Sequence, residues 1–252
     1  MENLPSPPSI SFRTIVFGAN GAVGRELIDY LLKSNKYSKI TIIVRKKIDK
    51  WNTYSNDEKS ILNIIELESL DFLINDLKQI ENLIPNIKLY NSIFSTLGSR
   101  VKKGKEEFNK VEKLYTIQIL KICEEYFIQH FSYISSSKAN KNSFFMLWKI
   151  KGETEEELEK INSIPLISIF RPGLLKERDN DKRLGESLVD FVPFFTKIKV
   201  KDVAKAMVIN DIKFLENFIL FDNSIENNNK VEKIENSDII ILSQKIYNSI
   251  YL

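Results

Sequence analysis

The chain has 252 residues, of which 43% are hydrophobic and 28% are charged, as in soluble globular proteins. Its 37 basic and 34 acidic residues give a formal charge of +3, so no global field favours nucleic acid or an anionic membrane as a partner. The single cysteine, Cys123, excludes an intramolecular disulfide, and with only one histidine a structural zinc site is implausible.

Residues 1–11 have neither a basic start nor an apolar core, so we expect a short disordered lead rather than a signal peptide. No apolar run reaches the roughly 18 residues that span a bilayer. From residue 12 onward, short β-rich runs alternate with helical stretches, which predicts one α/β domain over 12–252 with a parallel sheet and crossover helices. Strands are expected at 13–18, 39–44, 61–66, 89–95, 130–135, 166–171 and 217–221. Helices are expected at 22–33, 70–82, 105–127, 144–162, 185–191, 201–211 and 237–250. The polar stretches 52–59 and 222–236 are expected to be loops.

The first strand ends in three glycines spaced three apart, Gly18, Gly21 and Gly24, and a helix follows. Gly18 suits a tight turn, Gly21 lets backbone amides approach a phosphate, and Gly24 lets the helix pack on the strand. The free amides at the start of the helix would face the anion. The alternative is an ordinary strand-to-helix turn. The context favours a nucleotide site, and with it a Rossmann-like, doubly wound sheet carrying a small C-terminal α/β appendage.

The second strand ends in Arg45, Lys46 and Lys47. At this place a dinucleotide-binding fold meets the adenosine ribose, where a basic residue suits a 2′-phosphate. Arg45 therefore favours NADP over NAD, although a solvated basic strand end would have the same composition. After the third strand, Glu66 and Leu67 stand where such folds place an acidic residue near the adenine.

The fourth strand ends in Ser95-Thr96-Leu97-Gly98, and its small residues would let the backbone approach the central riboses. The basic run 100–105 follows this strand without interleaved aromatic residues, so a nucleic-acid site is not expected there. A solvated loop is the first interpretation of that run, and a docking patch for an acidic protein is the second.

Several separated motifs resemble one known family. They are Ser38–Thr41 leading to Arg45–Lys47; Phe108, Val111, Glu112 and Tyr115; His130-Phe131 with Ser135-Ser136; Lys151-Gly152-Glu153; Phe170–Leu175; and Arg183 with Gly185-Glu186. From about Ile15 to about Asp211, the chain resembles the atypical short-chain dehydrogenase/reductases and, within them, the family of the Tat-interacting protein of 30 kDa (CC3), an NADPH-binding regulatory protein.

The resemblance implies a set of cofactor contacts. Gly18, Asn20, Gly21, Ala22 and Val23 would wrap the pyrophosphate, Arg45 and Lys46 would hold the 2′-phosphate, and Leu97 and Gly98 would border the central cofactor. Lys151 would bond the nicotinamide ribose, while Pro172, Leu175 and Arg183 would contact the nicotinamide half.

One position departs from the superfamily pattern. A tyrosine four residues before the lysine normally exchanges the substrate proton, and counting back from Lys151 gives Leu147. Residues four apart share a helix face, so a tyrosine there would lie beside the ammonium, which would lower the pKa of the phenol. Leucine has no proton to exchange. Tyr133, on the fifth strand, is a disfavoured substitute.

The remaining candidates for substrate contact are Ser135 and Ser136, because a hydroxyl at the carboxyl end of a parallel strand faces the ligand crevice. A turn or capping role for these serines is the alternative. His130, which precedes the fifth strand at the other end of the sheet, is expected to be structural.

Two functions fit this pattern. One is an NADP(H)-binding regulator or adaptor with weak or absent turnover, whose protein partner would be of the transport or trafficking type that the family resemblance implies. The other is an active NADPH-dependent oxidoreductase of a small carbonyl or alcohol. We expect a cytoplasmic location, with the nucleus as a second one, no metal site and no membrane span; the oligomeric state stays open.

Overall fold

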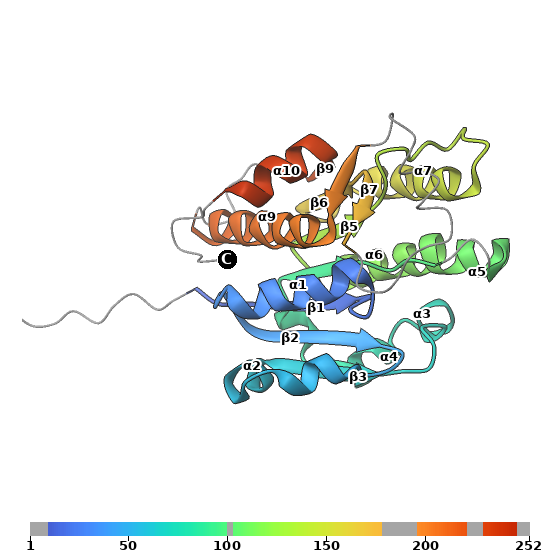
Figure 1. The fold of residues 1–252 in the computed structure, drawn as a ribbon. Coiled ribbons are helices and arrows are strands. Elements are labelled where there is room, and N and C mark those ends of the chain that lie inside the picture. The colour runs from blue at the N-terminus through green and yellow to red at the C-terminus, as the bar shows by residue number, and fades with distance from the viewer. Residues whose placement is uncertain (1–9, 100–102, 178–195, 221–228, 246–252) are drawn as a thin grey trace, which may run out of the picture.

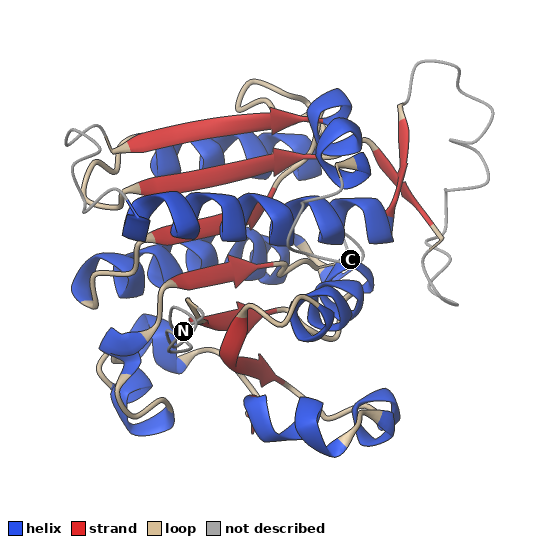
Figure 2. Ribbon diagram, turned by 90° about the vertical axis from the view of Figure 1, so that its left-hand side faces the viewer, coloured by secondary structure: helices blue, strands red, loops and turns tan. Residues whose placement is uncertain are grey.

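A computed structural model describes residues 10–99, 103–177, 196–220 and 229–245. Seven strands form one sheet in the order β3-β2-β1-β4-β5-β6-β9, and every neighbouring pair is parallel. The strands are β1 Phe12–Phe17, β2 Tyr37–Val44, β3 Leu62–Glu66, β4 Ser92–Ser95, β5 His130–Ile134, β6 Leu166–Arg171 and β9 Lys230–Glu235. The order 3-2-1-4-5-6 is that of the dinucleotide-binding fold, so the expected Rossmann-like architecture is confirmed. Figure 2 shows the strands as a stack of arrows with helices in front and behind.

Helices cover both faces of the sheet. The long ones are α1 Ala22–Lys33, α6 Tyr115–Glu125, α7 Met146–Glu159, α9 Val200–Leu220 and α10 Asn236–Gln244. The short ones are α2 Asn56–Ile61, α3 Phe72–Asn75, α4 Gln79–Leu83 and α5 Lys105–Asn109, with 3₁₀ turns at Asp49–Thr53 and Ile87–Leu89. Helices α1 and α9 lie side by side (Figure 1), and α10 packs on α9. No helix among the described residues is long and apolar enough to cross a membrane.

Strand β1 shows why the sheet needs two covering layers. Phe12 and Val16 point into the core beneath α1 and α9, whereas Ile15 and Phe17 point into the core beneath α6. Side chains alternate along a strand, so a run that is apolar at nearly every position is stable only when both faces are buried. Because these strands pair in parallel, the carboxyl ends of β1, β2, β4, β5 and β6 lie along one edge of the sheet.

A π-helical segment, Lys110–Leu114, joins α5 to α6. The sequence predicted an unbroken helix over 105–127, and the structure keeps its extent but widens it at this point. Single π turns inside α-helices are frequent at functional sites. The π-helical segment contains Glu112, whose role is described below.

The structure corrects several sequence expectations. The loop expected over 52–59 instead includes the start of α2 at Asn56. The strand expected at 217–221 is wrong where the structure describes it, because α9 continues to Leu220. The loop expected over 222–236 instead contains β9, which pairs with β6 as an edge strand. The helix expected at 70–82 is divided into α3 and α4. A small second sheet pairs β7 Leu174–Lys176 with β8 Lys197–Lys199, and the helix expected at 185–191 lies outside the described residues.

His130 is fully buried at the amino end of β5. Its Nδ1 lies 2.6 Å from Asp211 Oδ1 on α9, and its Nε2 lies 2.9 Å from Ser168 Oγ on β6. Asp211 also accepts hydrogen bonds from Tyr37 Oη at 2.5 Å and Ser92 Oγ at 3.0 Å. This network joins four strands, β2, β4, β5 and β6, to helix α9 at the end of the sheet opposite the glycine turn. It supports the expected structural role for His130.

Candidate functional site: a cavity at the carboxyl ends of the strands

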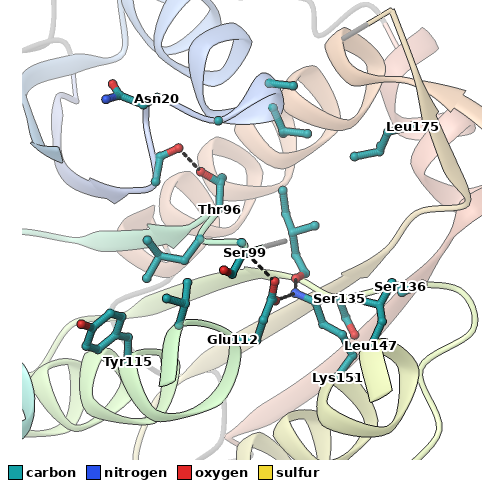
Figure 3. A pocket seen from close by; sticks show the side chains of 18 of the residues that line it. Asn20, Thr96, Ser99, Glu112, Tyr115, Ser135, Ser136, Leu147, Lys151 and Leu175 are labelled. Carbon is teal, nitrogen blue, oxygen red and sulfur yellow. Dashed lines mark hydrogen bonds and ion pairs between the residues drawn. The ribbon is translucent and has the colours of Figure 1, made fainter. Parts of the chain in front are cut away.

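A cavity of about 890 Å³ lies along the edge where the parallel strands end. Such an edge is where open α/β sheets bind ligands, because the connections diverge there. Among the residues predicted from the sequence, those that line it are Gly18, Asn20, Gly21, Ala22, Val23, Arg45, Leu97, Gly98, Ser135, Ser136, Lys151, Pro172 and Leu175. Figure 3 shows Asn20 on one side of this cavity, with Leu147 and Leu175 on the other.

The glycine turn begins the cavity wall. Gly18 has a φ of +88°, a conformation that favours glycine. A tight turn follows, in which the Gly21 N–H donates a hydrogen bond to Gly18 O at 2.9 Å. A Cβ on Gly24 would lie 2.3 Å from Gly18 O, so only glycine allows α1 to approach the strand this closely. Helix α1 starts at Ala22 with no side-chain cap. Its first amides are therefore available to an anionic ligand.

Asn20 holds the turn against the end of β2. Its Nδ2 donates to Lys46 O at 2.7 Å, and Arg25 Nη1 donates to Asn20 O at 2.8 Å. Asn20 Oδ1 is buried and has no hydrogen-bond partner among the described residues. A buried acceptor left without a donor costs free energy, so the site is suited to a ligand that brings a donor to this oxygen.

The four predicted adenosine contacts, Arg45, Lys46, Glu66 and Leu67, differ in their relation to the cavity. Arg45 lines the cavity and is exposed, whereas the Lys46 side chain is exposed but does not line it. The Glu66 carboxylate accepts from Lys47 N–H at 2.6 Å, and Leu67 N–H donates to Val44 O at 2.8 Å. The cavity wall beyond β3 is instead formed by Glu68, Ser69 and Leu70. Adenine recognition by Glu66 and Leu67 and phosphate binding by Lys46 stay predictions.

The end of β4 is fixed to the glycine turn. Thr96 Oγ1 lies 3.1 Å from Phe17 O and 3.0 Å from Gly18 O, which holds the two strand ends together. Leu97 and Gly98 follow along the middle of the cavity. The next residue, Ser99, donates its N–H to Glu112 Oε1 at 2.8 Å. This wall is thus connected to the π-helical segment.

Lys151 lies on α7 and is only 6% exposed. Its Nζ lies 2.7 Å from Glu112 Oε2, 2.7 Å from Ile134 O and 3.2 Å from Tyr133 Oη (Figure 3 shows the Glu112 contact). The ammonium group thus donates two hydrogen bonds, to Ile134 O and Tyr133 Oη, and forms an ion pair with the Glu112 carboxylate. Burial lowers the pKa of Lys151, but Glu112 and Tyr133 outweigh that effect and raise the pKa above its ordinary value.

Glu112 is a site residue to which the sequence reasoning gave no role. It is 3% exposed and lines the cavity beside Lys151. One signal in the sequence marks it, because Phe108, Glu112, Tyr115 and Ile119 follow a helical spacing and the other three are buried apolar residues. A carboxylate in an apolar stripe implies a buried cationic partner.

The two candidate serines differ. Ser135 is 5% exposed and its hydroxyl donates to Glu155, a buried carboxylate that also lies 3.3 Å from Arg171 Nε. Ser136 is half-buried, and its Oγ accepts from Lys138 N–H at 3.3 Å. Both line the cavity, but the proton of Ser135 points to Glu155. Ser135 can therefore offer a ligand only its lone pairs.

Leu147 lines the cavity one helical turn before Lys151, at the position where a reductase would carry the tyrosine. Tyr133 does not replace it. Its side chain is 1% exposed and lies outside the set of described residues that line the cavity. Burial raises the pKa of the Tyr133 phenol, and the Lys151 ammonium offsets this only in part. Tyr115 does line the cavity, but its hydroxyl donates to Asp71 Oδ1 at 2.7 Å. Neither of these two phenols therefore takes the place of the missing one at position 147. The predicted Arg183 lies outside the described residues.

Comparisons with known proteins agree with this geometry. The sequence profile of a family described as NAD(P)H-binding matches residues 18–209. Protein HTATIP2 of Rattus norvegicus is 30% identical over 174 residues, which cover 69% of this chain and 66% of that protein. Protein FMP52, mitochondrial, of Lodderomyces elongisporus is 28% identical over 206 residues, covering 77% of this chain and 84% of that protein. The resemblance stated from the motifs is thereby confirmed.

Solved structures of similar fold include enzymes in complex with a sugar nucleotide or with NAD. A UDP-glucose 4-epimerase of Thermotoga maritima with UDP-glucose superposes with a TM-score of 0.61 at 14% identity, covering 88% of this chain and 76% of that one. The enzyme WbmG of Bordetella bronchiseptica, in complex with NAD, gives a TM-score of 0.60 at 11% identity, covering 91% and 73%. At these identities the likeness shows the fold alone.

Proposed function

We propose that this chain, which belongs to the NAD(P)H-binding family and to the atypical short-chain dehydrogenase/reductases, binds NADP(H) as a regulator or adaptor with weak or absent redox turnover. The observation that carries the proposal is Leu147. It occupies the cavity wall where proton transfer would need a phenol, next to a lysine that Glu112 already neutralises.

The residues that surround the glycine turn fit a dinucleotide. The uncapped amides of α1 suit the pyrophosphate, and the unpartnered Asn20 Oδ1 suits a ligand donor. Arg45 is exposed on the cavity side of β2, where its guanidinium suits a 2′-phosphate by a charge-assisted, two-pronged contact. The preference for NADP over NAD rests on this residue.

When bound, the cofactor would supply hydride chemistry, so turnover would depend on proton transfer by the chain. Leu147 transfers no proton, and the Ser135 hydroxyl donates to Glu155. Lys151 donates to Ile134 O and Tyr133 Oη and is paired with Glu112. Loss of a positioned acid or base typically lowers rates by roughly 10² to 10⁴ while leaving binding intact. Cofactor binding without efficient reduction follows.

The second candidate function is an active NADPH-dependent oxidoreductase of a small carbonyl or alcohol. It is favoured by Ser136 and Lys151, which both line the cavity at the carboxyl ends of the strands. For the regulator, we propose a protein partner of the transport or trafficking type and a cytoplasmic location, with the nucleus as a second one. The fungal relatives named FMP52 are described as mitochondrial, so imaging of a fluorescent fusion should include a mitochondrial marker.

Titration of the purified protein with NADPH and with NADH tests the cofactor assignment. Trp148 lines the cavity, so its fluorescence should be quenched on binding, and NADPH should bind at least roughly tenfold more tightly. A Trp148→Phe variant should lose the quench yet retain heat of binding in calorimetry. Equal affinity for the two nucleotides would remove the role of Arg45, and no binding of either would overturn the proposed function.

A further inference from the structure

The cavity has two chemically different ends, because its lining residues come from opposite sides of β1 in the strand order. Arg45 and Glu68 lie on the side of β2 and β3, where Lys110 of the π-helical segment pairs with Asp71 at the start of α3. Across β4, toward β5 and β6, the wall is formed by Phe145, Leu147 and Trp148 at the start of α7 and by Leu174 and Leu175 of β7. The second end is the apolar end described below.

Two polar groups near the apolar end, Lys151 and Ser135, are engaged within the protein. Lys151 contacts Glu112, Tyr133 and Ile134, and the Ser135 hydroxyl donates to Glu155. Lys138 is exposed on the loop after β5. Lys138 and Ser136 also line the cavity, but a ligand charge placed against Leu147, Leu174 and Leu175 would be desolvated by apolar side chains. Recognition at this end therefore relies mainly on apolar contact.

The aromatic part of this wall is held in place. The ring centroids of Phe145 and Trp148 lie 4.7 Å apart, and the interplanar angle of 66° gives an edge-to-face arrangement. The Trp148 carbonyl accepts from Asn140 N–H at 2.9 Å, and the Phe145 carbonyl accepts from Lys149 N–H at 2.9 Å. Phe145 is nevertheless 65% exposed, which leaves ring surface for a ligand to cover.

We propose that the apolar end binds an uncharged aromatic molecule alongside the dinucleotide. This inference rests on the proposed function for the location of the cofactor, and it adds the class of the second ligand. The total volume of about 890 Å³ lies near the upper end of the roughly 300–1,000 Å³ of small-ligand sites. Edge-to-face and offset contacts with Trp148 and Phe145, together with burial against Leu147 and Leu175, supply the binding energy.

The test uses Prodan, a neutral naphthyl ketone whose emission shifts to the blue in apolar surroundings, added to the full chain with and without saturating NADPH. Binding should be displaced by neutral 2-acetylnaphthalene and not by 2-naphthoate, its anionic counterpart. Equal displacement by 2-naphthoate would overturn the proposed neutral class and point to Lys138 as an anion contact.

Variants locate the probe. Leu147→Asp and, independently, Leu175→Asp should each weaken Prodan binding by roughly tenfold or more, because an unpaired carboxylate is desolvated against the ring. Leu147→Met preserves volume and should retain binding, and Phe144→Asp alters a fully exposed ring that does not line the cavity and should also retain it. Loss of Prodan binding in Phe144→Asp, or unchanged Prodan binding in both Leu147→Asp and Leu175→Asp, would overturn the inference. Thermal melts and the NADPH titration check that each variant is folded and still binds the nucleotide. If the protein binds Prodan but not NADPH, the proposed function is rejected and the assignment of the apolar end to a neutral aromatic ligand is kept.

Discussion

Nζ of Lys151 on α7 lies 2.7 Å from Oε2 of Glu112 in the π-helical segment, and both side chains are almost completely buried. The carboxylate also accepts Ser99 N–H, so one ion pair connects α7 to the wall that follows β4. A pair that is buried this deeply is expensive to break, because either partner left alone would be an uncompensated charge in the interior.

A double-mutant cycle should show this coupling. We expect Glu112→Gln and Lys151→Met each to lower the free energy of unfolding by about 3–5 kcal/mol, and the double variant to lose much less than the sum. Urea unfolding followed by circular dichroism measures all four proteins. Lys113→Ala, which breaks the more exposed Lys113–Glu153 pair one residue further along, is the control and should cost less than about 1 kcal/mol. Additive losses at 112 and 151 would contradict the coupling.

Restoring a phenol on the cavity wall should restore turnover. Leu147→Tyr places a hydroxyl one turn before Lys151, on the same face of α7, and we expect NADPH oxidation with a panel of small aldehydes and ketones to rise by roughly 10²-fold or more. The absorbance of NADPH at its long-wavelength band measures the rate. Leu147→Phe supplies the ring without the hydroxyl and should stay at the wild-type level. A wild-type rate that already matches the tyrosine variant would favour the oxidoreductase instead.

Arg45 should decide between the two nucleotides. Arg45→Ala is expected to weaken NADPH binding roughly 10- to 100-fold, the loss of about 1.5–3 kcal/mol from a charged hydrogen-bonding contact, and to leave NADH binding nearly unchanged. Calorimetry with both nucleotides gives the two affinities. Lys47→Ala removes an exposed side chain two residues away and serves as the matched control. A parallel loss for NADH would place Arg45 on a part of the cofactor that both nucleotides share.

Glu232 on β9 should make stability depend on acid pH. Burial alone would raise the pKa of its carboxyl group, but hydrogen bonds from Asn210 Nδ2 at 3.0 Å and Ser168 Oγ at 2.8 Å outweigh burial and lower it. A folded-state pKa below the unfolded value of about 4.3 gives stability that is present above that pH and lost as pH falls through the folded value.

Glu232→Gln should therefore unfold more easily than wild type at pH 6, by roughly 1–3 kcal/mol, and the difference should shrink as the pH approaches 3. Urea unfolding at a series of pH values gives the comparison. Glu106→Gln, on an exposed position of α5, should show little difference from wild type at any pH in the series. If the difference in unfolding free energy between wild type and Glu232→Gln grew toward pH 3, the folded-state pKa of Glu232 would not be lowered.

The sequence predicted the sheet interior and the cavity rim better than the C-terminal part. Gly18 and Gly24 could be predicted from local rules, because a positive φ and a close helix approach require glycine. The edge strand β9 was missed because its sequence, Lys-Val-Glu-Lys-Ile-Glu, is mostly charged, as solvent-exposed edges often are. Conversely, the apolar run near Ile219 suggested a strand, and a short apolar run does not distinguish a strand from the end of a helix.

The Glu112–Lys151 contact could not be read from spacing along the chain. The two residues are separated by 39 positions, and their meeting depends on the π-helical segment and on α7 packing against it. The partners of Ser135 depend in the same way on tertiary structure, because Glu155 lies on α7 and Arg171 ends β6.

The pairing of β9 with β6 also has a consequence for biosynthesis. Strand β6 ends at Arg171, but its neighbour is completed only at Glu235, after the whole of α9 has been made. At elongation rates of about 5–20 residues per second, the growing polypeptide exposes the unpaired margin of β6 for several seconds. During that interval a nascent chain offers hydrogen-bonding groups to any extended segment nearby, so assistance from a holdase at the ribosome exit would raise the yield of folded product.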